Sequence, residues 1–140
     1  MIPLRGFTRL ELPAELASLA KVDAHFRSLL SAAGVAAVVS EDIVLSVNEA
    51  MNNAVDHGSR YQRDLTVTLD YRLESDRFVL LLTDPGGRTF DPGYFRELAI
   101  RKDWAIGGRG ILIMHELMDE LLFFFIPGRS TTVMLAKALG

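Results

Sequence analysis

The fold is indicated most clearly by Gly107-Gly-Arg-Gly-Ile-Leu-Ile-Met-His-Glu-Leu-Met-Asp-Glu-Leu121, a glycine-rich turn that leads into a helical pattern. Apolar residues recur every three or four positions after the last glycine, which predicts a helix with Met114 and Met118 in the core. Backbone N–H groups at the start of such a helix form a natural seat for phosphate. A glycine-rich segment of this kind is weak evidence alone, so it has to be interpreted together with the rest of the chain.

Two strand patterns follow this helix and are joined by a turn at Pro127-Gly128. The strands are expected at Leu121–Ile126 and Thr131–Lys137. The segment Phe123–Phe125, with rings that alternate in pointing inward, is predicted to belong to the core of the sheet.

Two further strands precede the glycine-rich segment. Leu65–Tyr71 alternates apolar and polar residues, and Phe78–Thr83 is apolar enough for the centre of a sheet. The second strand runs into the loop Asp84-Pro-Gly-Gly-Arg-Thr-Phe-Asp91. Residues 91–106 are ambiguous, because the pattern allows one short helix around Tyr94–Ile100 followed by a mobile segment.

The N-terminal third predicts a short strand at Phe7–Leu12 and two helices. Pro13 opens the first helix, which ends at Gly34. Ser40 is expected to cap the second helix, which stops at Gly58. The resulting order, β-α-α-β-β-(α)-α-β-β, predicts a two-layer α/β sandwich with a mixed, mainly antiparallel sheet and helices on one face.

Composition narrows the class of protein. A chain of 140 residues with 49% hydrophobic residues suits a single domain, residues 1–140, without disulfides, and it contains no cysteine. The net charge of −3, with no basic stripe, argues against direct binding of nucleic acid. The apolar runs are too short to cross a bilayer and the first residues do not resemble a signal peptide, so we expect a cytoplasmic protein.

Polar residues gather at three places where packing does not require them. Glu49 and Asn53 lie one helical turn apart, so the carboxylate and the carboxamide share a face and can act on a hydroxyl and a hard cation. Asp84 ends an apolar strand beside Gly86, where a carboxylate can accept a hydrogen bond from an amino group. Each feature alone also fits a solvated helix face or an ordinary turn.

The features taken together are specific. The series Glu49-Ala-Met-Asn-Asn53-Ala-Val-Asp-His57-Gly58, Asp84-x-Gly86, Gly108-x-Gly110 and Ser130-Thr131-Thr132 resembles the Bergerat ATP-binding fold of the gyrase, heat-shock chaperone and histidine kinase ATPases. In its length and in the sequence of these motifs, the chain is most similar to the stand-alone bacterial anti-sigma factor serine/threonine kinases. The resemblance covers nearly the whole chain, residues 7–137.

This resemblance implies a role for each matching residue. Glu49 corresponds to the family's general base, and Asn53 to the ligand of the Mg²⁺ that bridges the phosphates of ATP. Asp84 would hold the adenine amine with support from Thr131. The resemblance also implies that Gly86 lets the base approach and that Gly108 and Gly110 shape the lid over the phosphates. Ile106 stands where some family kinases carry a basic lid residue, and the candidates to reach the γ-phosphate in its place are Arg101, Lys102 and Arg109.

The resemblance also implies a function. The chain would be an ATP- and Mg²⁺-dependent kinase that phosphorylates a serine or threonine of a small anti-anti-sigma (STAS-like) protein, binds a sigma factor and forms a homodimer, with the first helix beside Lys21 and Arg27 as one candidate surface. Ile106 and Ser130 depart from the family pattern, and they motivate an alternative, a regulator that binds nucleotide and a partner without catalysis. The catalytic half of a split histidine kinase is a third, weaker hypothesis.

Overall fold

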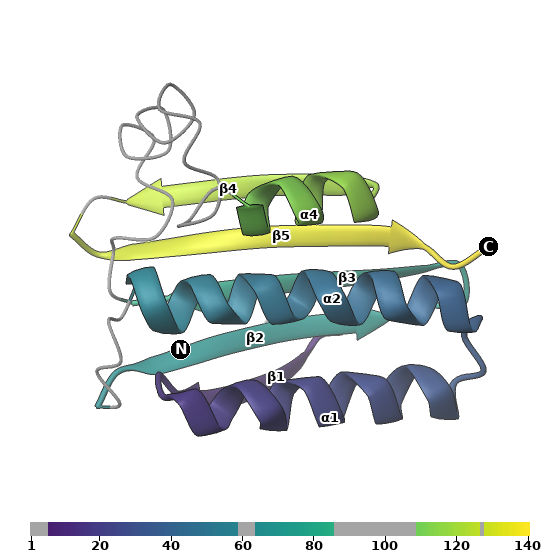
Figure 1. Cartoon of the computed structure of the whole chain (residues 1–140), viewed down its shortest axis with the longest axis horizontal. Helices are drawn as coiled ribbons and strands as arrows, with labels where there is room; N and C mark the ends of the chain where they lie inside the picture. Colours follow the sequence, from purple (N-terminus) through teal and green to yellow (C-terminus); the bar gives the residue numbers. More distant parts are fainter. Residues whose placement is uncertain (1–5, 59–63, 86–108, 127) are drawn as a thin grey trace.

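The computed structural model describes residues 6–58, 64–85, 109–126 and 128–140. Five strands form one sheet in the order β1-β2-β3-β5-β4, and every pairing among them is antiparallel (Figure 1). The elements are β1 (Thr8–Pro13), α1 (Leu16–Ala32), α2 (Ala37–Asn53), the π-helix η1 (Ala54–Gly58), β2 (Thr66–Leu73), β3 (Arg77–Asp84), α4 (Arg109–Leu117), β4 (Glu120–Ile126) and β5 (Ser130–Ala138).

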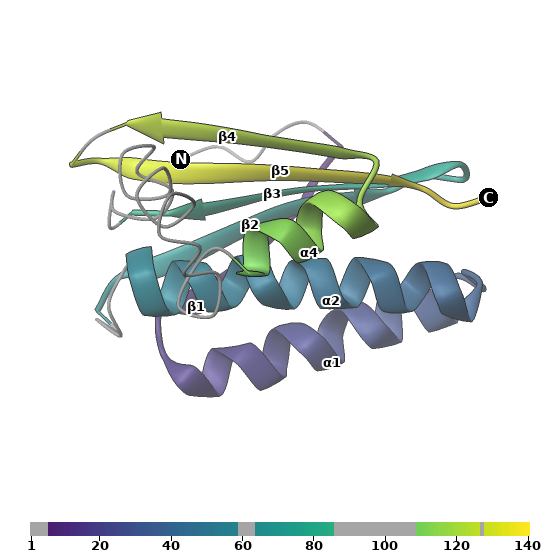
Figure 2. The ribbon, with the colours of Figure 1, turned by 45° about the horizontal axis from the view of Figure 1, so that its top comes forward.

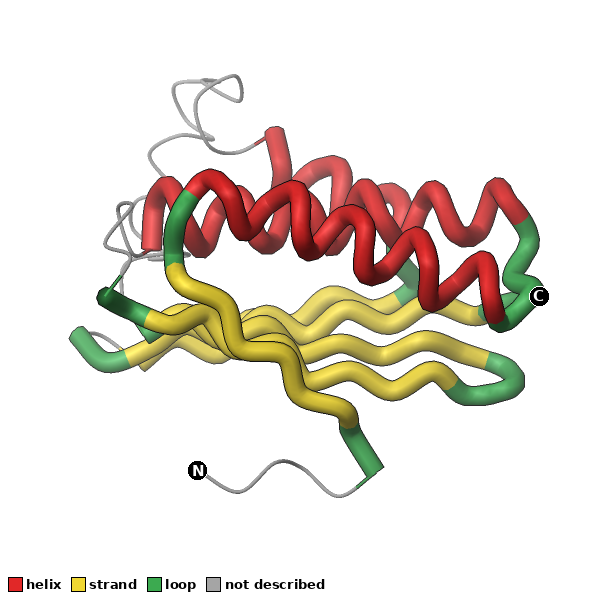
Figure 3. Tube along the Cα trace, turned by 90° about the horizontal axis from the view of Figure 1, so that it is seen from below, coloured by secondary structure: helices red, strands yellow, loops and turns green. Residues whose placement is uncertain are grey.

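The helices of the described chain form one layer and the strands form the other, as Figures 2 and 3 show. This arrangement confirms the predicted two-layer α/β sandwich. The core lies between the layers, where Phe26 of α1 meets Tyr71 of β2 and Phe78 of β3 in edge-to-face contacts. Met114 and Met118 are also buried there, as predicted.

One strand is out of sequence order. β5 lies between β3 and β4, so among the described strands β4 has a partner on one side only and forms an edge of the sheet. The prediction that Phe123–Phe125 belong to the core of the sheet is therefore wrong for Phe123 and Phe124, which are 36% and 53% exposed. The alternation of side chains was predicted correctly, but periodicity does not distinguish an edge strand from a central one.

The apolar stripe of α1 faces the core. Val22, Phe26 and Leu30 are fully buried at a spacing of four residues, so the stripe that suggested a dimer surface is covered within the domain. Arg27, on the exposed side, donates hydrogen bonds to the carboxylates of Asp23 and Glu41.

The start of α2 differs from the prediction. The helix begins at Ala37, and Ser40 lies inside its first turn, where the hydroxyl donates a 3.4 Å hydrogen bond to the carbonyl of Val35. Gly34, at a φ of +75°, turns the chain so sharply that the backbone N–H of Val35 bonds back to the carbonyl of Leu30. The second helix follows at once and needs no side-chain cap.

We expect Gly34→Ala to lower the free energy of unfolding by about 1 kcal/mol, because an L side chain is strained at this left-handed φ. No atom within 4 Å would meet the new methyl group, so a clash plays no part. Chemical denaturation measures the change. Gly140→Ala is the control, since its methyl group also meets no atom within 4 Å and no left-handed φ is involved; equal stability of the two variants would contradict the argument.

The expected helix around Tyr94–Ile100, with Ile106 and the rest of that segment, falls outside the described residues. Within the described chain, no helix is both long and apolar enough to span a bilayer.

Candidate functional site

The C-terminal half of α2 presents the first two predicted site residues. The amide of Asn48 donates a 2.8 Å hydrogen bond to Asp23 on α1, which fixes the rotation of α2 about its axis. Together with the Arg27 guanidinium, this bond lowers the pKa of Asp23. Because consecutive helical residues point about 100° apart, Glu49 is directed away from α1.

Gly110, in the first turn of α4, lies directly against Glu49 and Asn53. A Cβ atom built on Gly110 would stand 2.7 Å from Oε2 of Glu49, and 3.4 Å and 3.6 Å from Nδ2 and Oδ1 of Asn53. Three residues that the sequence placed in two separate motifs thus meet at one point. Glycine is the residue that lets α4 approach the two polar side chains this closely.

The other predicted pair is formed by the sheet. Asp84 is the last residue of β3 and is directly opposite Thr131 near the start of β5. Both side chains are 1% exposed. A buried carboxylate beside a buried hydroxyl is a suitable acceptor and donor pair for a polar ligand edge. The sequence placed Asp84 where an apolar strand runs into a loop, and the structure makes it the last residue of β3, in the final pair of the β3–β5 ladder.

A second pair of hydroxyls was missed by the sequence analysis. The side chains of Thr83 and Thr132 share a 2.9 Å hydrogen bond, one position along the same ladder. Because side chains alternate between the faces of a strand, this bond lies on the face opposite Asp84 and Thr131. It strengthens the register that pairs them. The signal that could have predicted this hydrogen bond is the presence of Thr83 next to Asp84 and of Thr132 next to Thr131.

The two halves of the site are linked by η1. This π-helix continues α2 directly after Asn53 and contacts β3, the strand that ends at Asp84. Single turns of π-helix inside or at the end of an α-helix occur frequently at functional sites. No pattern in the sequence predicted this π-helix.

Mg²⁺, which the resemblance implies, suits these oxygen donors. The amide oxygen of Asn53 and the carboxylate of Glu49 converge on Gly110, and Asn53 is 3% exposed. No group of three or more His, Cys, Asp or Glu residues in the described part of the chain could hold a metal ion. A single amide ligand fits Mg²⁺, which commonly takes one or two protein ligands and completes its shell with phosphate oxygens and water.

The structure does not describe the other predicted site residues in full. Gly86 and Gly108 lie outside the described residues. Arg109 is the first residue of α4, but its side chain is not described.

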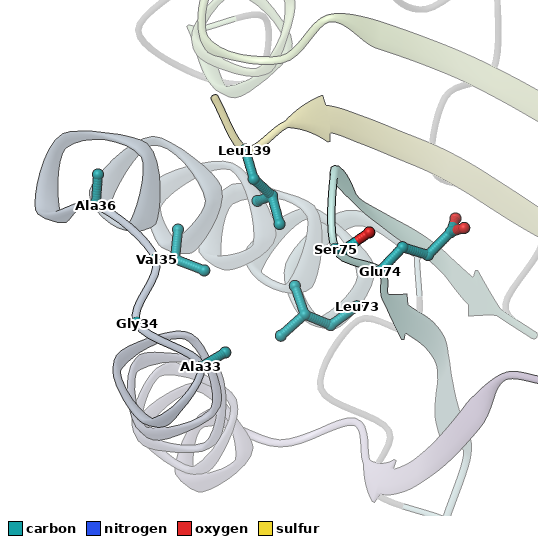
Figure 4. Close-up of a pocket in the computed structure, with 8 residues that line it drawn as sticks. All are labelled: Ala33, Gly34, Val35, Ala36, Leu73, Glu74, Ser75 and Leu139. Carbon is teal, nitrogen blue, oxygen red and sulfur yellow. The ribbon is translucent and has the colours of Figure 1, made fainter.

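A pocket of about 540 Å³ lies elsewhere, at the opposite end of α2 and β3 (Figure 4). Its walls are the connection between α1 and α2, the turn between β2 and β3, and Leu139. Small and apolar side chains dominate it, with Glu74 as its charged member. Its position at the other end of α2 separates this pocket from the convergence of Glu49, Asn53 and Gly110.

The fold and the sequence together define the class of protein. The chain belongs to the histidine kinase-like ATPase domain family, whose sequence pattern matches residues 12–136. This match confirms the resemblance that the glycine-rich and acidic motifs indicated.

Relatives within the family carry more specific names. The serine-protein kinase RsbW of Listeria innocua serovar 6a is 27% identical over 133 residues, which span 89% of this chain and 83% of the relative. The anti-sigma F factor of Halalkalibacterium halodurans is 31% identical over 100 residues, or 70% and 68% of the two chains. The prediction of an anti-sigma serine kinase therefore agrees with the names of these relatives.

Two solved structures share the fold. A structure of RsbU and RsbW domains from Mycobacterium tuberculosis superposes with a TM-score of 0.69 at 20% identity, covering 94% of this chain and 32% of that one. The SiaB–SiaC complex from Pseudomonas aeruginosa gives a TM-score of 0.68 at 12% identity, covering 96% and 91%.

Proposed function

We propose that this protein is a cytoplasmic, homodimeric anti-sigma kinase that transfers the γ-phosphoryl group of ATP, with Mg²⁺, to a serine or threonine of a small anti-anti-sigma protein. When that anti-anti-sigma protein is unphosphorylated, the kinase would release a sigma factor. The observation that carries the proposal is the convergence of Glu49, Asn53 and Gly110 at the junction of α2 and α4. Relatives named as serine-protein kinases and as an anti-sigma F factor support it.

In this proposal Glu49 is the general base. Its carboxylate accepts the proton of the attacking hydroxyl while the new bond forms between that oxygen and the γ-phosphorus, and the bond to ADP breaks. The backbone N–H groups at the start of α4 face the phosphates. Bound Mg²⁺ would neutralise phosphate charge, with the amide oxygen of Asn53 as its protein ligand.

Asp84 and Thr131 bind the base of the nucleotide in the same proposal. The carboxylate accepts a hydrogen bond from the exocyclic amine of adenine, and the hydroxyl of Thr131 holds the carboxylate or a bridging water in place. Both groups are almost fully buried, so a base that presented an acceptor in place of the amine would face the carboxylate at a cost in binding free energy. This penalty makes the pair selective for adenine.

Calorimetric titration with ATP, with and without Mg²⁺, tests the nucleotide site. We expect wild type to bind ATP in a Mg²⁺-dependent manner. Asp84→Asn should weaken the binding of ATP by about 10- to 100-fold, because the N–H donor of the new amide would then face the N–H donor of the adenine amine. Thr131→Val should have a smaller effect, about 5-fold, since it removes one neutral hydrogen-bonding group.

Circular dichroism melting of each variant is the control for folding. The proposal would be wrong if Asp84→Asn bound ATP as tightly as wild type. Transfer of labelled phosphate to the purified anti-anti-sigma proteins of the source organism, tried one at a time, then tests the kinase step. ATP binding without transfer to any of them would favour the non-catalytic regulator.

A further inference from the structure

β4 is an unusual edge strand. Its sequence, Glu-Leu-Leu-Phe-Phe-Phe-Ile, has one charged residue, at its first position, and contains no lysine or proline. Figure 1 shows β4 at the margin of the sheet, with β5 on one side of it. Natural proteins blunt such edges with charge, proline or a bulge, because an open row of backbone N–H and C=O groups pairs readily with another strand.

The open face of β4 is apolar as well. Leu122, Phe124 and Ile126 are 51%, 53% and 50% exposed. They pair with Met134, Thr132 and Ser130 of β5, whose inward neighbours Val133 and Leu135 are buried. All three side chains therefore project from the face of the sheet that the helices do not cover. Apolar patches of this kind on a folded domain commonly mark an interaction site.

The pattern of β4 is symmetric about Phe124. If a second β4 pairs antiparallel with the two Phe124 residues opposite each other, Leu122 of each copy lies opposite Ile126 of the other. On the helix-facing side, Phe123 then lies opposite Phe125. Every apolar side chain of the strand between Leu122 and Ile126 thus meets another apolar side chain, in a single register.

The charges at the two ends of the strand complement each other in that register. Asp119 and Glu120 stand at the start of β4, and Arg129 stands just beyond its end. All three are exposed. The two-fold axis brings Arg129 of one copy level with the acidic pair of the other. Opposite charges across a strand pair are stabilising, and like charges in a shifted register would be repelled.

We propose that β4 is the homodimer interface: a second copy of this chain pairs its β4 antiparallel to the first about a two-fold axis at Phe124, so that two five-stranded sheets become one of ten strands. This inference rests on the homodimer of the proposed function and assigns its surface. The internal symmetry of the strand favours a second copy over an unrelated peptide, because a peptide partner would not require it.

Single-cysteine crosslinking tests the register, since the chain has no cysteine of its own. Residues directly opposite in an antiparallel pair have Cα atoms about 4.5–5.5 Å apart, which is within the range for a disulfide. Phe124→Cys should therefore form a disulfide-linked dimer on mild oxidation. Leu122→Cys should not, because its two copies would be about 13 Å apart along the strand. Combining Leu122→Cys with Ile126→Cys should restore crosslinking.

Light scattering coupled to size exclusion measures the association itself. Wild type should be a dimer at tens of micromolar, and Phe124→Lys should raise the dissociation constant by about 100-fold, because it places two like charges on the symmetry axis. Leu16→Lys is the matched control, since Leu16 is a 62% exposed apolar residue on α1 and its replacement should leave the dimer intact.

Three results would overturn the assignment: a monomeric wild type, a dimer that Phe124→Lys leaves unchanged, or crosslinking through Leu122→Cys alone. The second would leave the homodimer standing on another surface, and the third would leave it in another register. Calorimetric titration with ATP on the same samples reports on the nucleotide site separately, so failure of the interface and failure of the proposed function are distinguishable.

Discussion

Replacing Glu49 with glutamine should reduce phosphoryl transfer by about 10²- to 10⁴-fold, the range expected on removal of a general base. Glutamine has nearly the same shape as glutamate but does not take up the hydroxyl proton. The binding of ATP should stay within about 3-fold of wild type, because Asp84 and Thr131, which bind the base in our proposal, are unchanged. Single-turnover transfer of labelled phosphate measures the rate.

The nearby Asn48→Asp is not a suitable control, because it would set a carboxylate against Asp23. Glu116→Gln is better matched, since Glu116 is an exposed carboxylate on α4 that the proposal does not use. It should leave the transfer rate unchanged. If Glu49→Gln transferred phosphate at the wild-type rate, Glu49 would not be the base.

Gly110→Ala should separate activity from stability. The new methyl group would stand 2.7 Å from Oε2 of Glu49, which is the end of a flexible side chain and can move aside. Stability should therefore remain within about 1 kcal/mol of wild type, helped by the better helix propensity of alanine. Phosphoryl transfer should fall by about 100-fold, because a displacement of about 1 Å in a reacting group costs that much.

A double-mutant comparison shows whether the effect passes through Glu49. Once Glu49→Gln has removed the base, adding Gly110→Ala should slow transfer little further, since the methyl group then displaces a group that no longer reacts. Multiplied losses in the double variant would mean that Gly110 acts on the nucleotide independently of Glu49. A large loss of stability in Gly110→Ala would mean that α4 itself had moved.

Local patterns predicted the elements well but not how they are combined. Helical spacing identified the buried face of α1, alternation identified β2, and an apolar run identified β3, because these patterns reflect burial within about ten residues. The order of strands depends on pairing between distant segments. The sequence therefore gave no indication that β5 enters between β3 and β4, and Phe124 was expected in the core although it lies at the edge.

The candidate site shows the same division. Its residue types were predicted from Glu49, Asn53, Asp84 and the glycines, because a motif is read directly from the chain. Their contacts were not predicted. The approach of Gly110 to Glu49 depends on how α4 packs on α2, and the pairing of Asp84 with Thr131 depends on the register of two strands separated by most of the C-terminal half.

The central place of β5 in the sheet has a consequence for biosynthesis. Proteins are made from the N-terminus, and segments that have emerged from the ribosome begin to fold while the rest is still being made. Until β5 has emerged, β3 is paired with β2 but has one open edge, and β4 lacks the strand that it pairs with in the described sheet. The nascent chain therefore carries an open apolar edge and an apolar strand without its partner, a state prone to aggregation, for as long as synthesis of β5 is delayed.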